Sequence, residues 1–229
     1  LKLADGIYPY TVKALDLAGW ESEVSNEVTF RIDFTGPAAS IKYPENGARL
    51  MGLIDVKGTA FSVDDFKQYR MYFGWGASPS SWTLIRTSPL PVSYGALAQW
   101  DTAGLADGEY TLRLETEDIS GNISSYLARV VVDAAAPGAP LLVSATNSGS
   151  NIIVTWNAVG AVDLAGYLVF RDGQVVNAPS GAMGGLKSYL VSGLTYTNTA
   201  LPDGTFTYFV AAMDDAGNVS EQSNSMSAT

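Results

Sequence analysis

Aspartates are the side chains in this sequence whose type and recurring position suggest site chemistry. The chain has no histidine and no cysteine, which removes the commonest general base and metal ligand, thiol nucleophiles, disulfides and thiolate metal sites. Aspartate carboxylates remain, and their oxygens are hard ligands of the kind that calcium takes. The first question is therefore whether these carboxylates lie where they can bind a metal.

Two sets of aspartates are candidates for calcium. One set lies in three short Asp-x-x-Gly turns and consists of Asp16, Asp118 and the pair Asp214 and Asp215. These turns lack the dense acidic spacing of a dedicated calcium loop, so a hairpin turn closed by its aspartate is the favoured interpretation. The other set is Asp33 and Asp133, which precede proline-terminated links that calcium would stiffen. Asp33, Asp118 and Asp133 are the candidate calcium ligands, and otherwise no cofactor is expected.

Other suggestive pairs have simpler explanations. Asp64-Asp65 resembles a catalytic carboxylate pair, but neighbours on a strand point to opposite faces, and a loop before a strand is the favoured setting. Asn122 and Asn218 begin glycosylation sequons, yet both sit at the fourth place of the hairpin turn, directly after the glycine of Asp-x-x-Gly, and turn chemistry explains them. No catalytic residue is predicted, and the chain is not expected to be an enzyme.

Tryptophans are the other possible binding feature, because flat exposed rings suit carbohydrate binding. Trp75 and Trp82 are the candidate ligand residues. The alternative is that Tyr69 and Phe73 face the core while Trp82 and Trp100 cover a sheet edge. Core packing is favoured, since aromatic residues dominate sandwich cores, and Trp75 is expected to be the most exposed.

Composition narrows the function classes. Lys and Arg number 13 against 23 Asp and Glu, with no basic stretch, so no nucleic-acid partner is expected. The sequence has no run of 18 apolar residues, so no membrane span is expected, and any export signal is predicted to lie outside the chain. The 23 glycines and 10 prolines in 229 residues favour many short strands joined by turns.

An internal repeat provides the elements that position these residues. Asp5-Gly6, Asp107-Gly108 and Asp203-Gly204 are each followed by an alternating apolar segment and then by an Asp-x-x-Gly turn. Successive copies begin 102 and 96 residues apart, about the length of one β-sandwich domain. Each copy therefore predicts the last two strands, F and G, of a sandwich.

An aromatic residue near the start of each predicted strand F occupies the place of a tyrosine corner. The three residues are Tyr8, Tyr110 and Phe206. Phe206 has no hydroxyl, so the third copy is expected to lack the corner hydrogen bond.

The repeat and the proline links predict the domain boundaries. Residues 1–33 are interpreted as the closing hairpin of a truncated sandwich, 34–136 as a complete sandwich and 137–229 as another. An isolated hairpin is marginal in water, so either preceding chain or a partner must complete the first unit. The fold class is all-β, with tandem antiparallel β-sandwiches.

The final segment resembles a fibronectin type III domain of bacterial secreted proteins. The resemblance covers Ile153-Val154-Thr155-Trp156, with Trp156 as the core tryptophan, Gly166–Gly173 and Tyr208–Asp214. Residues 34–136 resemble a bacterial immunoglobulin-like module, through Ile41–Gly47 and Val56–Ala60. The resemblance implies a spacer, stalk or adhesive module of a large extracellular or cell-surface bacterial protein, without catalytic residues.

The favoured function is a non-catalytic structural or adhesive array that displays other domains. One alternative is a carbohydrate-binding or accessory segment of an exported enzyme, and another is a subunit that assembles by strand exchange. The expected partners are neighbouring domains of the same chain, and a surface glycan or protein is the further possibility.

Overall fold

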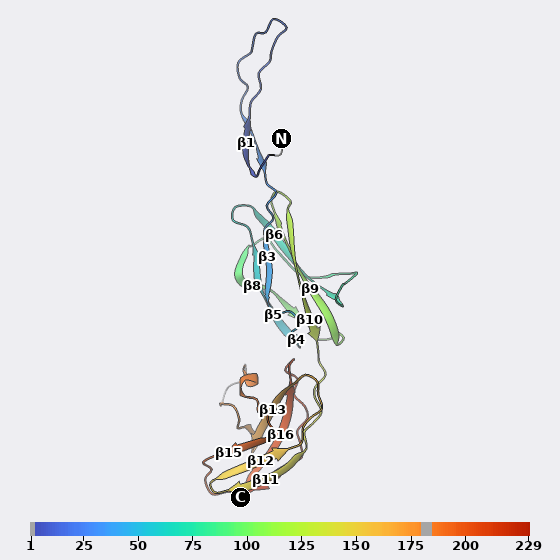
Figure 1. Cartoon of the computed structure of the whole chain (residues 1–229), viewed down its shortest axis with the longest axis vertical. Coiled ribbons are helices and arrows are strands. Elements are labelled where there is room, and N and C mark those ends of the chain that lie inside the picture. Colours follow the sequence, from blue (N-terminus) through green and yellow to red (C-terminus); the bar gives the residue numbers. More distant parts are fainter. Residues whose placement is uncertain (1–2, 180–184) are drawn as a thin grey trace.

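The computed structural model describes residues 3–179 and 185–229. Its regular structure is β throughout, apart from the short 3-10 helix Leu186–Tyr189. A hairpin and two sandwiches follow one another along an elongated molecule (Figure 1). Within the described residues, no helix is long and apolar enough to cross a membrane.

The hairpin consists of β1 (Gly6–Tyr10) and β2 (Val28–Ile32). The two strands pair antiparallel, with Tyr8 opposite Phe30. A long extension between them reaches away from the rest of the molecule and ends at the turn that begins with Asp16 (Figure 1). β1 and β2 form a two-stranded sheet, in which each strand pairs only with the other among the described residues.

The middle sandwich has two sheets, in the orders β3-β5-β8 and β4-β10-β9-β6-β7. Its strands are β3 (Ala38–Tyr43), β4 (Arg49–Leu50), β5 (Leu53–Phe61), β6 (Phe66–Trp75), β7 (Thr83–Ser88), β8 (Val92–Asp101), β9 (Gly108–Asp118) and β10 (Ile123–Val132). β4 and β10 pair in parallel, which departs from the purely antiparallel prediction. The chain crosses from one sheet to the other after β3 and places the two residues of β4 beside the final strand.

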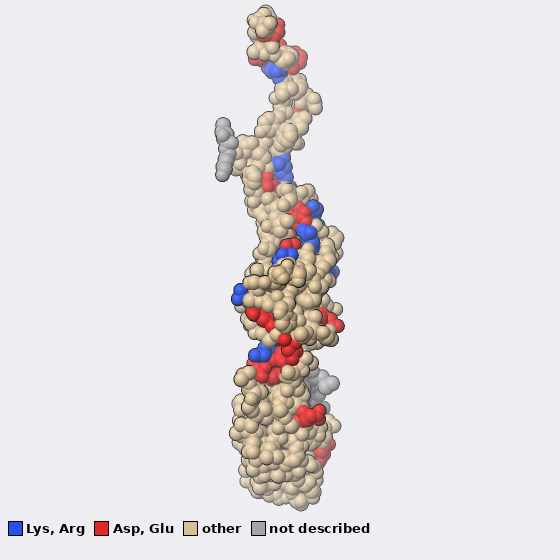
Figure 2. Space-filling view, turned by 90° about the vertical axis from the view of Figure 1, so that its right-hand side faces the viewer, with Lys and Arg blue, Asp and Glu red and all other residues tan. Residues whose placement is uncertain are grey.

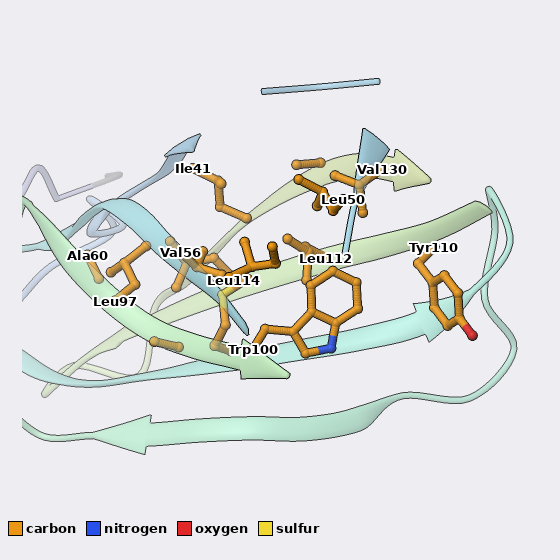
Figure 3. Packing of buried hydrophobic residues seen from close by; sticks show 14 of the residues in the cluster. Ile41, Leu50, Val56, Ala60, Leu97, Trp100, Tyr110, Leu112, Leu114 and Val130 are labelled. Atoms are coloured by element: carbon orange, nitrogen blue, oxygen red, sulfur yellow. The ribbon is translucent and has the colours of Figure 1, made fainter. Parts of the chain in front are cut away.

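Alternation along β9 builds the middle core. Tyr110, Leu112 and Leu114 face inward and are at most 4% exposed, as every second residue of a half-buried strand must be. Trp100, from the opposite sheet, packs beside Tyr110 with ring centroids 6.0 Å apart (Figure 3). Trp100 is 2% exposed, so its expected place over a sheet edge was wrong. Its large ring fills the space between the sheets instead.

The third unit repeats this arrangement in the sheet orders β11-β12-β15 and β14-β13-β16-β17. Its strands are β11 (Leu142–Ser148), β12 (Asn151–Trp156), β13 (Leu164–Arg171), β14 (Gln174–Val175), β15 (Thr195–Asn198), β16 (Phe206–Asp214) and β17 (Met226–Ala228). Trp156 is 3% exposed and meets the ring of Tyr167 edge to face. The all-β fold of tandem sandwiches is confirmed.

Candidate functional site

The turn after strand F holds a buried carboxylate in both sandwiches. Asp118 and Asp214 are fully buried, and each closes its turn by accepting two hydrogen bonds from one asparagine. Asn122 donates its backbone amide to Asp118 at 2.8 Å and its side-chain amide at 2.9 Å. Asn218 makes the same two bonds to Asp214, both 2.8 Å long. Gly121, inside the first of these turns, has φ +89°, which glycine adopts without steric cost.

The side-chain amide of each asparagine also reaches the link before its module. Nδ2 of Asn122 donates to the carbonyl of Asp33 at 3.2 Å, and Nδ2 of Asn218 donates to the carbonyl of Asp133 at 3.0 Å. The explanation of these asparagines by turn chemistry was therefore incomplete. A sequence signal existed, because the Asp-x-x-Gly turn that begins at Asp16 has Trp20 where the other two turns are followed by an asparagine.

Each link is also tied to the module that it leaves. Asp5 accepts a hydrogen bond from the amide of Phe34 at 3.0 Å, and Asp107 accepts one from the amide of Ala134 at 2.9 Å. These aspartates belong to the Asp-Gly turns that open strand F. Each link thus forms hydrogen bonds both with the module before it and with the module after it.

A third aspartate completes an acidic cluster at each joint. The clusters are Asp33, Asp65 and Asp118, and Asp133, Asp163 and Asp214, and within each the carboxylate oxygens lie within 4.8 Å of one another. Asp65 and Asp163 come from the loops before β6 and β13. The loop setting expected for Asp64-Asp65 is present, but Asp65 is buried at the joint whereas Asp64 is exposed.

An arginine neutralises part of the charge of each cluster. Nη2 of Arg31 lies 2.5 Å from Asp65 Oδ2 and 3.2 Å from Asp33 Oδ2. Nη1 of Arg49 lies 2.9 Å from Asp133 Oδ2 and 3.2 Å from Asp163 Oδ2. The two arginines occupy unrelated positions, on β2 and β4, so the repeat alone could not have located them. Figure 2 shows acidic and basic side chains gathered where the two sandwiches meet.

The pKa of Asp33 is held below its ordinary value. The first cause is its hydrogen bond with the neighbouring carboxyl of Asp65, followed by the backbone amide of Thr35. The hydroxyl of Ser120 and the guanidinium of Arg31 act in the same direction, while burial opposes them. This carboxyl therefore stays ionised in the folded joint.

The clusters supply carboxylate oxygens as possible metal ligands. Asp33, Asp118 and Asp133, the predicted calcium ligands, fall into them, with Asp33 and Asp118 in one cluster and Asp133 in the other. Three carboxylates per joint are the hard donors that calcium prefers, and the residues present fit such an ion. The same carboxylates also fit the hydrogen bonds and ion pairs described here, so the arrangement can fix a joint without a metal.

The two candidate ligand tryptophans have different surroundings. Trp75 is 58% exposed, and its edge-to-face neighbour Tyr110 lies 5.0 Å away between ring centroids. Trp82 stacks on the guanidinium of Arg113 at 4.3 Å, and the same guanidinium lies 4.7 Å from the ring of Tyr72. The ring of Trp82 is therefore partly engaged within the protein, whereas that of Trp75 is open to solvent.

Tyrosine corners are present at two of the three predicted places. The hydroxyl of Tyr8 donates to the carbonyl of Ala4 at 2.8 Å, and that of Tyr110 donates to the carbonyl of Ala106 at 3.1 Å. Phe206 packs against the guanidinium of Arg171, 5.1 Å from its ring centroid.

Sequence comparisons relate the chain to segments of longer bacterial proteins. It is 28% identical over 252 residues to Exoglucanase B of Cellulomonas fimi, an alignment that covers 99% of the chain and 20% of that protein. It is 33% identical over 136 residues to Chitinase A1 of Niallia circulans, covering 55% of the chain and 18% of that protein. The chain thus spans about a fifth of the length of these relatives. No family model matches the sequence.

Structural comparisons agree on the fold. Fibronectin(III)-like modules of Clostridium thermocellum CbhA superpose with a TM-score of 0.53 at 19% identity, covering 82% of this chain and 91% of theirs. The FN1-FN3 domains of chicken CNTN1 give a TM-score of 0.57 at 18% identity, covering 97% of this chain and 74% of theirs. The predicted resemblance to immunoglobulin-like and fibronectin type III modules is confirmed at the level of fold.

Proposed function

We propose that this chain is a non-catalytic spacer within a larger exported bacterial enzyme, and that its function is to hold neighbouring domains at a fixed separation. The observation that carries the proposal is the repeated joint. Both links are fixed by the same asparagine amide, the same Asp-Gly carboxylate and the same kind of acidic cluster. A flexible tether would gain nothing from such contacts, whereas a spacer of defined length requires them.

The relatives support an exported enzyme as the parent. Proteins named as an exoglucanase and as chitinases contain segments similar to this chain, which corresponds to about a fifth of their length. The sequence contains neither histidine nor cysteine, so a histidine general base and a cysteine nucleophile are excluded. An extracellular location and neighbouring domains of the same polypeptide follow from this proposal.

Small-angle X-ray scattering tests the fixed separation of the domains, and an activity assay tests the non-catalytic role. The expected distance distribution is that of a single extended particle at all protein concentrations, and the purified chain is expected to release no sugar from cellulose or chitin. Release of sugar by the purified chain itself, rather than by a contaminating enzyme, would contradict the non-catalytic role. A broad ensemble of compact shapes would contradict the fixed separation.

Calcium at the joints is a second proposal, carried by the three carboxylates that meet within 4.8 Å at each of two joints. Thermal unfolding in calcium chloride and in EDTA tests it. The expected result is a higher melting temperature in calcium that disappears in the double variant Asp118→Asn/Asp214→Asn, which removes one carboxylate from each cluster. Asp64→Asn, which alters the exposed neighbour of Asp65, is the matched control. Equal melting temperatures in calcium and EDTA would limit the joints to direct protein contacts.

Carbohydrate binding is a third proposal, carried by the open ring of Trp75. Pull-down on insoluble cellulose and chitin tests it, and Trp75→Ala is expected to abolish retention. Trp82→Ala, which removes a ring already stacked on Arg113, is expected to reduce retention less. Absence of retention of the unaltered chain on both polymers would remove this proposal.

A further inference from the structure

A cleft of about 420 Å³ lies at the second joint, between the middle sandwich and the third unit. The middle sandwich contributes Tyr43, Glu45 and Arg49 to its lining, and the third unit contributes Lys187 and Asp215. Sites for small ligands have volumes of about 300–1,000 Å³ and occur preferentially where domains meet. The cleft therefore has the size and the location of a ligand site.

Hydrogen bonds to β10 hold the wall that the middle sandwich supplies. Tyr43 is the last residue of β3, and Glu45 follows in the turn before β4. In the same turn, the amide of Gly47 donates to the carbonyl of Arg129 at 2.7 Å, and the side-chain oxygen of Asn46 accepts a hydrogen bond from the amide of Arg129 at 2.9 Å. A wall fixed in this way loses little conformational freedom when a ligand binds.

The opposite wall is fixed as well, and Asp163 connects the two. Asp215 follows β16, and its amide donates to the carbonyl of Asp163 at 2.8 Å. Nζ of Lys187 donates to the carbonyl of Asp215. The carboxylate of Asp163 pairs with Nη1 of Arg49 at 3.2 Å, which ties this wall to the middle sandwich. The two walls therefore keep a defined distance.

The lining combines an open aromatic ring with charges of both signs. Tyr43 is 46% exposed, so a face of its ring is available for stacking. Among the described residues, the carboxylates of Glu45 and Asp215 balance the cationic groups of Arg49 and Lys187. A balanced lining favours a ligand without net charge, and the ring favours a ligand with a flat apolar face. A neutral sugar has both properties, because hydroxyl groups surround a ring whose face consists of C–H bonds.

The first joint lacks this combination. Its cavity of about 360 Å³ is lined by three carboxylates, those of Asp5, Asp33 and Asp64, and by the guanidinium of Arg31. The described part of that lining contains no aromatic ring, and its charge is mainly negative. The acidic cluster that the joints share therefore does not create the sugar-like lining, which belongs to the second joint.

We propose that the cleft at the second joint binds a single chain of a neutral oligosaccharide, with one sugar ring stacked on Tyr43 and its hydroxyl groups bonded to Glu45 and Lys187. The cleft admits a free chain, whereas the open ring of Trp75 suits the surface of an insoluble polymer, so the two sites take different probes. The inference goes beyond the spacer role and shares with it the fixed second joint.

Isothermal titration calorimetry with soluble oligosaccharides of equal length tests the ligand class. The neutral probes are oligomers of glucose, xylose, mannose and N-acetylglucosamine, and the charged probes are anionic oligogalacturonate and cationic chitosan oligomers. All titrations use the Trp75→Ala chain, so that the exposed tryptophan does not contribute. At least one neutral oligomer is expected to bind more tightly than both charged ones. Tighter binding of a charged oligomer, or no binding of any neutral one, would overturn the proposal.

Variants of the lining test the location of the site. Tyr43→Ala is expected to weaken binding roughly tenfold through the lost stacking, whereas Tyr43→Phe keeps the ring and most of the affinity. Glu45→Gln, a change of an exposed side chain, is expected to weaken binding without affecting the fold. Tyr94→Ala removes another exposed tyrosine of the same sandwich and is the control. Unchanged affinity in both Tyr43→Ala and Glu45→Gln, or a loss in Tyr94→Ala, would show that the ligand lies elsewhere.

Insertion of Gly-Gly-Ser between Ala135 and Ala136 tests whether both walls are needed. The longer link frees the modules from each other and is expected to abolish binding. Affinity that survives the insertion would overturn a site shared by two modules. Scattering on the unaltered chain distinguishes this inference from the spacer role: a flexible joint combined with binding that depends on Tyr43 would reject the spacer alone, and a rigid joint without binding would reject the site alone.

Discussion

Asn122 and Asn218 each connect two modules through a single side-chain amide. In both cases Nδ2 bridges the turn aspartate of one module and the carbonyl of the preceding link. One amide thereby fixes the turn and the joint at once. The joint residues consequently govern the separation of modules more than the stability of either one.

Replacement of these asparagines by alanine is therefore expected to loosen the joints while the modules stay folded. Asn122→Ala and Asn218→Ala each remove side-chain hydrogen bonds, for a cost of roughly 1–3 kcal/mol in a partly buried site. Scattering is expected to show a broader distance distribution, and calorimetry a small fall in melting temperature. Asn147→Ala, on an exposed part of β11, is the control and is expected to change neither. An unchanged distance distribution in a variant that combines Asn122→Ala with Asn218→Ala would mean that other contacts fix the joints.

Asp33 predicts a pH dependence of the first joint. Its pKa lies below the ordinary value of 3.8, so the folded chain holds this carboxyl ionised at a pH where the unfolded chain begins to protonate it. The resulting stabilisation is complete above about pH 5 and is lost as the pH falls through the folded pKa. Urea unfolding of the unaltered chain and of Asp33→Asn at pH 3 to 7 measures it. The stability difference is expected to be constant near neutrality and to shrink in acid, and a difference that grows in acid would contradict the assignment.

At the scale of elements, the period-2 pattern of β9 accounts for the core. Leu112 faces inward and is fully buried. On the paired strand β10, Leu127 is one residue away from Ala128, the partner of Leu112, and it faces outward and is 55% exposed. Leu112→Ala is expected to destabilise the middle sandwich by about 2–5 kcal/mol through lost burial and a cavity. Leu127→Ala is the matched control, expected to cost less than about 1 kcal/mol. Equal effects in denaturant unfolding would show that the inward face is misassigned.

The strands were predictable from the sequence because local patterns encode them. Alternating residues and the glycines of the turns identify β9, β10 and β16 without any knowledge of the rest of the chain. The joints were not predictable in the same way. Asp163 lies in a loop, and Arg49 lies on a two-residue strand. Neither stands at a recurring sequence distance from Asp133, and only the folded chain brings the three together. Trp100 shows a similar limit, since its burial depends on the opposite sheet.

At the scale of the whole molecule, the elongated shape depends on the length of each link. Asp133 and Ala134 make the contacts of the second joint within two consecutive residues, so the link contains no slack to absorb a change of length. Proline and short connections also restrict the chain on either side of the joint. A longer link would allow the modules to separate and rotate while each keeps its own core.

Insertion of Gly-Gly-Ser between Ala135 and Ala136 is therefore expected to convert the rigid particle into a flexible pair of modules, because glycine-rich segments behave as random coils. Small-angle scattering is expected to show a broader distance distribution, while both modules keep their melting temperatures. The same insertion after Gly149, in the exposed turn between β11 and β12, lengthens the chain equally without touching a joint. It is expected to leave the distribution unchanged. If both insertions give the distribution of the unaltered chain, the sandwiches are held by surfaces outside the link; if both broaden it, the change reflects added chain length and not the joint.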